Sequence, residues 1–273
     1  MQYKTLSIAG FDGSGGAGIQ ADLKTFSAFG CYGMTVLTAL PIQNTQGVSK
    51  CYGLPLTAIE EQLSAIFTDI RPDSIKIGML FKAEIVSLVA NFLKTHAQNI
   101  PIVLDPVLMA KSGDALLLPN ALEALKSELI PLATLITPNL PEAQALLGMN
   151  VNFADEMPAI AEKLLELGGS AVLLKGGHLH DKENSNDLFL NQNGELHWFT
   201  SPRIVSKNTH GTGCTLSAAI ASGLALGLDL LSACKIAKKY IYHAIEAAKN
   251  EKVGSGNGPV HHFYHLWPTI DKI

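Results

Sequence analysis

The segment Asn208–Cys214, which reads NTHGTGC, combines backbone groups that can bind an anion with a side chain that can move a proton. Backbone N–H groups beside Gly211 and Gly213 can turn toward a ligand, since no Cβ blocks them. The small and apolar run over 215–223 predicts a helix, whose N-terminus adds positive potential at the same place. A thiol there is expected to favour its thiolate form. The segment predicts chemistry on a phosphate or another oxyanion; the alternative is a buried cysteine that opens a core helix.

Four polar side chains, Asp12, Asp105, Asn139 and Lys175, each follow a predicted strand. Ligands of open parallel sheets bind at the C-terminal ends of the strands, so we expect these four groups to converge there. Asp105 fits a magnesium site, because Mg²⁺ takes one or two carboxylates together with phosphate oxygens. Lys175, beside two glycines, fits a phosphate contact. The alternatives are a loop cap at Asp105, an ordinary capping box formed by Asn139 with Glu142, and a solvated lysine.

The loop Gly13–Gly18 matches the G-x-G-x-x-G pattern of dinucleotide-binding folds. Those folds need an acidic residue roughly 20 positions further on, to bind the ribose. None lies between Leu23 and Ile59. We therefore expect the loop to approach a different ligand or to form a tight turn. The sequence also lacks the P-loop and nucleophile-elbow patterns, which argues against a P-loop enzyme and an α/β-hydrolase.

The histidines and cysteines do not form a metal or redox pattern. His178 and His180, and the group His261, His262 and His265, lack a supporting set of Cys or Glu ligands, so we expect ligand-loop or surface residues. The four cysteines include no C-x-x-C pair. We expect reduced thiols in a cytoplasmic protein.

Composition favours a small-molecule partner. The 273 residues are 47 % hydrophobic and 16 % charged, with a formal net charge of −4 and no long basic run. Nucleic acid and anionic membranes are therefore poor partners. The uncharged runs 25–49 and 210–228 contain too many polar residues and glycines for membrane spans, and the N-terminal residues lack the pattern of a secretory signal.

Strand-like and helix-like runs alternate along the chain, which predicts a mostly parallel sheet covered by helices on both faces. The chain shows no linker, repeat or low-complexity tract, so we expect one domain over 1–273. The predicted strands lie at 6–9, 35–42, 74–77, 100–104, 132–136 and 171–174, with a β-hairpin at 187–190 and 195–199. The predicted helices lie at 19–29, 58–70, 83–96, 121–129, 141–147, 157–167, after residue 211, and at 230–249.

Long motifs over nearly the whole chain resemble those of the hydroxymethylpyrimidine/phosphomethylpyrimidine kinases of thiamine biosynthesis, a branch of the ribokinase-like superfamily. They lie at 10–26, 39–47, 76–80, 105–113, 137–142, 174–179, 208–218 and 258–263. The resemblance implies a ribokinase-like three-layer α/β/α sandwich with a small β-hairpin. It also implies ATP- and Mg²⁺-dependent phosphorylation of the hydroxymethyl group of an aminopyrimidine, followed by phosphorylation of the monophosphate to the pyrophosphate. A homodimer is expected as well.

The resemblance also implies roles for individual residues. Cys214 is the catalytic base, and Gly211, Thr212 and Gly213 form the anion hole. The substrate contacts implied are Gly10, Asp12, Ala17, Gln43, Met79 and Val107. The ATP and phosphate contacts implied are Asn139, Glu142, Lys175 and Thr209, and the metal ligands implied are Asp105 and Glu142.

Two residues depart from the family pattern. Phe11 stands where a small hydroxyl residue is usual, and Gly13 replaces a proline or serine. Phe11 therefore leaves the substrate preference open, and a pyridoxal kinase of the same fold is the nearest alternative. A vitamin-binding protein without catalysis is disfavoured because Cys214, Asp105 and Lys175 are all present. A nicotinamide-dependent oxidoreductase is disfavoured because the ribose-binding acid is missing.

Overall fold

The computed structural model describes residues 2–109, 116–118, 120–149, 154–177, 179 and 183–267. Its centre is an eight-stranded sheet in the order β10-β9-β8-β7-β6-β5-β1-β2. Neighbouring strands pair in parallel in the part of the sheet formed by β8, β7, β6, β5, β1 and β2. The strands β9 and β10 are added antiparallel at the β8 edge. The strands are β1 (Lys4–Ala9), β2 (Tyr32–Leu37), β5 (Ser74–Ile77), β6 (Ile102–Leu104), β7 (Leu135–Ile136), β8 (Ala171–Lys175), β9 (Asn184–Asn191) and β10 (Leu196–Pro202).

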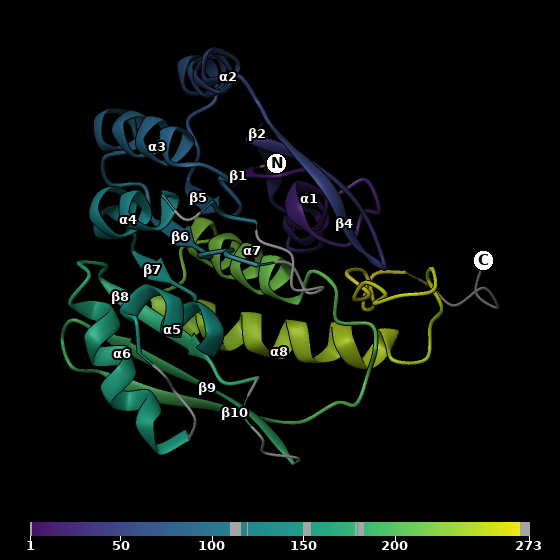
Figure 1. The fold of residues 1–273 in the computed structure, drawn as a ribbon. Helices are drawn as coiled ribbons and strands as arrows, with labels where there is room; N and C mark the ends of the chain where they lie inside the picture. Colours follow the sequence, from purple (N-terminus) through teal and green to yellow (C-terminus); the bar gives the residue numbers. More distant parts are fainter. Residues whose placement is uncertain are drawn as a thin grey trace.

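Helices cover both faces of this sheet (Figure 1). Ile102 and Leu104 of β6 belong to one hydrophobic core, and Val103 between them belongs to another. The first core also contains α2, α3 and α6, and the second contains α1, α7 and α8. The expected three-layer α/β/α sandwich is therefore confirmed. The helices are α1 (Gly18–Ala28), α2 (Leu56–Asp69), α3 (Ala83–His96), α4 (Ala121–Ala124), α5 (Leu140–Leu147), α6 (Met157–Leu165), α7 (Thr212–Ala225) and α8 (Leu230–Ala248).

The strand predicted over 35–42 is wrong, because two strands lie there. β2 ends at Leu37, and the side chain of Thr38 donates a hydrogen bond to the carbonyl of Met79, 2.6 Å away. The chain then leaves the main sheet as β3 (Ala39–Asn44), which pairs antiparallel with β4 (Gly47–Gly53). β4 was not expected from the sequence. This hairpin extends toward the segment that follows α8 (Figure 1), where the backbone N–H of Asn257 donates to the carbonyl of Thr45 at 2.7 Å.

The helix predicted over 121–129 is only partly correct. α4 is followed by a π-helical turn, η1 (Leu125–Leu129), and a 3₁₀ turn, η2 (Ile130–Leu132). Pro131 in the second turn has no N–H to donate, so a regular α-helix cannot continue through it. A further 3₁₀ turn, η3 (Ala154–Glu156), precedes α6. The hairpin predicted around Asn193-Gly194 is confirmed, and Gly194 has a φ of 79° in its turn.

The two uncharged runs are elements of this fold. Residues 25–49 include the end of α1 and the strands β2 and β3, and residues 210–228 include α7. In the part of the chain that the structure describes, no helix has the length and apolar character needed to cross a bilayer.

Candidate active site

The turn before α7 presents backbone groups to a cavity. Gly211 precedes the first residue of α7 with φ 76° and ψ 10°, a left-handed conformation that favours glycine. A Cβ on Gly211 would lie 1.8 Å from the carbonyl oxygen of Gly16, so no other residue fits. Gly211, Thr212, Gly213 and Cys214 all line the cavity. Because the first N–H groups of a helix have no partner within it, this turn can bind an oxyanion. We refer to residues 209–214 as the anion turn.

The cavity has a volume of about 930 Å³ and brings most of the predicted residues together. One part of its wall comes from the loop 10–18 and the β3–β4 hairpin, and another comes from the C-terminal ends of β6 and β8 and the start of α5. The predicted residues on its wall are Gly10, Ala17, Gln43, Met79, Asp105, Val107, Asn139, Glu142, Lys175, Thr209, Gly211, Thr212, Gly213 and Cys214.

Asp12 is the predicted substrate residue that does not line the cavity. Its carboxylate is fully buried and accepts hydrogen bonds from the backbone N–H groups of Ser14, Gly16 and Ala17 and from the ring of His210. Burial alone would raise the pKa of Asp12, but the bonds from His210 and Ser14 hold it well below its usual value. The expected convergence at the strand ends therefore applies to Asp105, Asn139 and Lys175, whereas Asp12 organises its own loop.

Lys175 lies among carboxylates at the ends of β6 and β8. Its Nζ is 2.9 Å from Oδ1 of Asp105 and 3.9 Å from Oε2 of Glu142. Asn139 and Glu142 also form the capping box of α5, so the structural alternative for this pair is confirmed alongside its place on the cavity wall. A Cβ on Gly213 would lie 3.2 Å from Oδ2 of Asp105 and 3.4 Å from Nζ of Lys175. The anion turn and this charged cluster are therefore adjacent.

The cluster fits a magnesium ion held jointly with phosphate. Burial and the charge of Asp105 raise the pKa of Glu142 to about 7, although Lys175 acts in the opposite direction. Two carboxylates beside one lysine leave negative charge that a further cation can balance. Among the described residues, no group of three or more His, Cys, Asp or Glu side chains could hold a metal ion by itself. Mg²⁺ needs no such cage, because it is bound through one or two carboxylates, waters and substrate phosphates.

The thiol of Cys214 does not behave as the sequence predicted. Burial raises its pKa to about 11, and Asp22 and Asp105 raise it as well. The charge of Lys76 and the backbone N–H of Gly18 lower it, but not enough to compensate. The prediction that the helix start favours the thiolate is therefore wrong, because the loss of hydration around the sulfur outweighs both groups.

A buried ion pair near Cys214 was not identified from the sequence. Lys76 of β5 lies at the cavity wall, and its Nζ is 2.8 Å from Oδ2 of Asp22 in α1, with both side chains fully buried. Ser7 donates to the same oxygen at 2.5 Å. The interaction with Asp22 is strong enough to raise the pKa of Lys76 despite its burial. The available signal was a lysine between two isoleucines in the predicted strand 74–77.

The two departures from the family pattern lie against each other. A Cβ on Gly13 would be 3.1 Å from Cε1 of Phe11, so the aromatic ring occupies the space that a side chain at position 13 would take. The carbonyl of Phe11 accepts a hydrogen bond from Nε2 of Gln43 at 3.2 Å. Phe11 thus contributes its backbone to the wall that also carries Gln43.

The histidines are only partly where the sequence placed them. His178 and His180 lie outside the described residues, as does the end of the motif at 105–113. His262 is buried rather than exposed, with 4 % of its surface accessible. Its Nε2 is 3.0 Å from Oγ1 of Thr215 in α7, and burial lowers its pKa to about 3. His261 is 3.9 Å from a carboxylate oxygen of Glu251.

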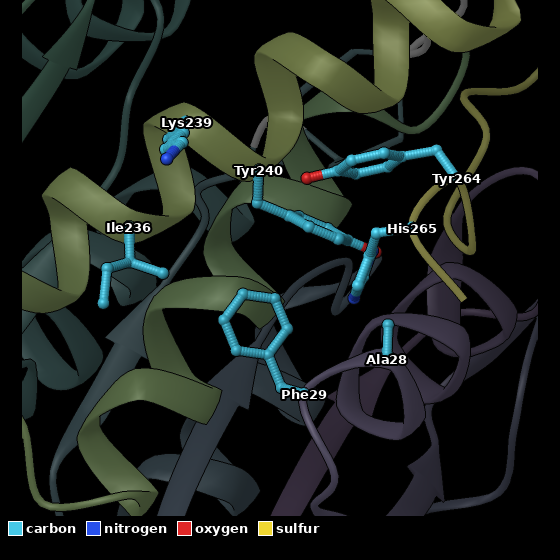
Figure 2. Close-up of a pocket in the computed structure, with 7 residues that line it drawn as sticks. All are labelled: Ala28, Phe29, Ile236, Lys239, Tyr240, Tyr264 and His265. Atoms are coloured by element: carbon cyan, nitrogen blue, oxygen red, sulfur yellow. The ribbon is translucent and has the colours of Figure 1, made fainter.

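A second, smaller pocket of about 230 Å³ lies between the end of α1, α8 and the residues that follow (Figure 2). Tyr240 lines this pocket and makes an edge-on contact with Phe29, with 5.0 Å between ring centroids. Its hydroxyl donates to the carbonyl of His262. The pocket contains none of the predicted catalytic groups, so the larger cavity is the candidate active site.

Comparisons with known proteins identify the family of this chain. Residues 12–261 match a family model described as phosphomethylpyrimidine kinase. The chain is 50 % identical over 268 residues to the hydroxymethylpyrimidine/phosphomethylpyrimidine kinase of Escherichia coli (strain K12), covering 97 % of this chain and 99 % of that protein. It is 40 % identical over 261 residues to the enzyme of the same name from Bacillus subtilis (strain 168), covering 96 % and 95 %.

Solved structures show the same fold. A phosphomethylpyrimidine kinase from Clostridium difficile 630 has a TM-score of 0.78 at 45 % identity, covering 89 % of this chain and 99 % of that one. A pyridoxal kinase from Bacillus subtilis, in complex with ADP, has a TM-score of 0.88 at 37 % identity, covering 97 % and 98 %. The ribokinase-like fold expected from the sequence is confirmed. From the length and identity of these matches, the chain belongs to the phosphomethylpyrimidine kinase family and is a kinase.

Proposed function

We infer that this protein uses ATP to phosphorylate 4-amino-5-hydroxymethyl-2-methylpyrimidine, and then phosphorylates the monophosphate to the pyrophosphate, in thiamine biosynthesis. The observation that carries this proposal is the position of the anion turn, which lies beside the Lys175 cluster in a cavity whose wall also includes Gln43. Family membership supports the choice of an aminopyrimidine as the acceptor.

On the phosphate side, Lys175 acts as a point charge for the transferred phosphoryl group. The N–H of Thr212 already donates to the carbonyl of Thr209 at 3.3 Å, which leaves the N–H groups of Gly211, Gly213 and Cys214 to stabilise the negative charge that shifts during transfer. Asp105 and Glu142 would hold Mg²⁺, which supplies charge neutralisation on the phosphate oxygens when bound. Asn139 and Thr209 complete this part of the wall.

On the acceptor side, Gln43 provides an amide that can recognise the aminopyrimidine ring. Its Nε2 already donates to the carbonyl of Phe11, which fixes the orientation of the amide. Gly10 and Met79 lie against each other, because a Cβ on Gly10 would be 2.9 Å from the sulfur of Met79. These residues, with Ala17 and Val107, form the apolar surroundings in which we place the ring.

Cys214 is the group we assign to the proton of the acceptor hydroxyl. In the transfer, the hydroxymethyl oxygen forms a bond to the γ-phosphorus of ATP, the bond to the ADP oxygen breaks, and the hydroxyl proton passes to the Cys214 sulfur. The sulfur can accept this proton only as a thiolate, and its high pKa opposes that form. Lys76 is the fixed positive charge that lowers the cost. A largely dissociative transition state makes limited demands on the base.

Pyridoxal is the second candidate substrate. The Bacillus subtilis pyridoxal kinase has a TM-score of 0.88, against 0.78 for the Clostridium difficile phosphomethylpyrimidine kinase. Pyridoxal also carries a hydroxymethyl group on an aromatic nitrogen heterocycle. The chemistry of the anion turn would serve both acceptors, so the residues around the ring must decide between them.

A substrate panel tests the proposal. Turnover would be measured with ATP, Mg²⁺ and one of three acceptors: the hydroxymethylpyrimidine, its monophosphate or pyridoxal. We expect kcat/KM to be highest for a pyrimidine acceptor and both pyrimidine products to form. A preference for pyridoxal would support the alternative, and no ADP above background with any acceptor would refute both.

We also propose that the protein is a cytoplasmic homodimer that joins through the β3–β4 hairpin. Ile42 and Tyr52 lie on one face of that hairpin and are 52 % and 48 % exposed. The four cysteines are free thiols, which suits a reducing compartment. Sedimentation should show a dimer in the native protein and a monomer in an Ile42→Lys variant. A native protein that sediments as a monomer would refute the dimer.

A further inference from the structure

The carboxylate of Asp12 is saturated by donors from the protein. Its Oδ1 accepts from the backbone N–H of Ser14 at 2.9 Å and from the hydroxyl of Ser14 at 2.6 Å. Its Oδ2 accepts from the N–H groups of Gly16 at 3.0 Å and Ala17 at 2.7 Å, and is 2.7 Å from Nε2 of His210. An ionised carboxylate only accepts hydrogen bonds, so Nε2 of His210 carries a hydrogen and donates it.

This bond joins two segments that both line the active-site cavity. Asp12 fixes the loop 10–18, which contributes Gly10 and Ala17 to the wall. His210 belongs to the anion turn 209–214, which contributes Cys214. The two partners are 198 positions apart in sequence. The side chains of Asp12 and His210 are 0 % and 14 % exposed, so water competes little for the contact.

The two segments touch so closely that their relative position has little freedom. The carbonyl of Gly16 is 1.8 Å from the point where a Cβ on Gly211 would lie. A Cβ on Gly16 would be 2.5 Å from Cδ2 of His210. The backbone N–H of His210 donates to the carbonyl of Gly258 at 3.0 Å, which holds this residue from its other side.

We propose that Asp12 and His210 are positioning residues that lock the loop 10–18 onto the anion turn. The acceptor hydroxyl, held beside the first segment, then meets Cys214 and the N–H groups of the second at a fixed separation. This proposal rests on the proposed kinase function. In reactions that depend on alignment, a displacement of about 1 Å can cost about 10²-fold in rate, so a single bond between the two halves of the site can control turnover.

The first test compares His210→Leu with His210→Gln and with His197→Leu as a matched control. His197 is exposed on β10, where its ring contacts Phe199. His210→Leu should lower kcat by about 10²-fold while the KM for ATP stays within about threefold, because alignment is lost and phosphate binding is not. His210→Gln keeps a donor and should recover part of kcat. His197→Leu should match the wild type.

The second test uses Asp12→Asn and its combination with His210→Leu. If the pair acts as one device, the double variant should be no slower than the worse single variant, within about threefold. Multiplying losses in the double variant would overturn the proposal. So would a His210→Leu variant whose kcat stays within about threefold of the wild type, because the bond would then serve stability alone. Should His210→Leu fail to fold, His210→Gln and Asp12→Asn carry the comparison.

A readout that does not depend on activity separates this proposal from the proposed function. The backbone N–H groups of Gly16 and Ala17 donate to the carboxylate of Asp12. Their amide hydrogens should exchange with solvent faster in His210→Leu than in the wild type and in His197→Leu. Unchanged exchange would overturn the locking role. If the wild type phosphorylates no acceptor, the proposed function fails, while the exchange measurement still decides whether the two segments are locked.

Discussion

Two lysines pair with aspartates near Cys214, and the two arrangements differ in their charge balance. Lys76 and Asp22 are both fully buried, and Nζ lies 2.8 and 2.9 Å from the two carboxylate oxygens. Lys175 is 14 % exposed in its side chain and faces two acids, Asp105 at 2.9 Å and Glu142 at 3.9 Å. The first pair is closed and neutral, whereas the second cluster is open to the cavity and has one carboxylate in excess.

This difference separates a structural role from a ligand-binding role for the same residue types. Asp22 also accepts from Ser7, so the closed pair has little capacity left for a ligand. The open cluster can exchange partners, because its excess carboxylate and its exposure allow a cation and a phosphate to enter. Exposure and charge count, more than residue identity, therefore indicate which ion pair can bind a ligand.

The largest effect is expected at Cys214, which lies within the electrostatic influence of both pairs. Cys214→Ala should fold normally and lose about 10²–10⁴-fold in kcat, the usual contribution of a positioned proton acceptor. Turnover of the purified variant with the hydroxymethylpyrimidine at saturating ATP measures this loss. A kcat within about threefold of the wild type would show that the anion turn alone suffices.

The next effect concerns the closed pair. Lys76→Met leaves Asp22 buried without its partner and should lower the free energy of unfolding by about 3–5 kcal/mol. A double variant, Lys76→Met with Asp22→Leu, should regain part of that stability because no uncompensated charge remains. Urea unfolding of the three proteins provides the measurement. Equal stabilities of Lys76→Met and the wild type would contradict the structural role.

The open cluster should respond in the opposite way. Lys175→Met removes a positive charge from the phosphate side of the cavity. It should lower kcat by about 10²-fold, which is the usual loss when one group that stabilises the charge of a transition state is removed. The urea midpoint of this variant should remain close to that of the wild type, because the carboxylates of Asp105 and Glu142 stay open to the cavity rather than sealed in the core. A variant that loses stability but retains wild-type kinetics at low ATP would reverse the assignment of the two lysines.

The smallest effect concerns His262, a buried group outside both pairs. Burial lowers its pKa from 6.5 to about 3, with smaller contributions from Lys24 and His261. As the pH falls below 6.5, the unfolded chain takes up a proton that the folded protein excludes, so stability should decrease. The limiting slope is about 1.4 kcal/mol per pH unit. Urea midpoints at several pH values should show a shallower slope for His262→Gln, and identical slopes would contradict this account.

Much of the fold was predictable because local pattern and tertiary packing agree. Ser74–Ile77 and Ala83–His96 begin and end where the sequence predicted, since apolar periodicity and helix or strand length both indicate them. The break at Thr38 was missed because residues 35–42 are all β-branched or apolar and resemble one strand. The hydrogen bond from Thr38 to Met79, distant in sequence, marks the point where the chain changes sheets.

The site was predictable in its members and less so in their states. The residues at the strand ends meet as parallel topology requires, with the exception of Asp12, which its own loop and His210 fully engage. The high pKa of Cys214 results from burial and from the charges of Asp22 and Asp105, which outweigh Lys76, and none of these follows from the position of a thiol at a helix start. The Lys76–Asp22 pair joins β5 to α1, and sequence spacing does not reveal that these two elements lie close together.

The most direct test of the account follows the γ-phosphoryl group itself. The wild-type protein would be incubated with γ-labelled ATP and the hydroxymethylpyrimidine, with Mg²⁺ or with a chelator. We predict that the label appears on the pyrimidine when Mg²⁺ is present and that transfer is largely lost when Mg²⁺ is removed. Lys175 supplies only one positive charge beside the carboxylates of Asp105 and Glu142, so the phosphates of ATP need the charge of the metal ion as well. Label released only as inorganic phosphate, with none on the pyrimidine, would contradict the account.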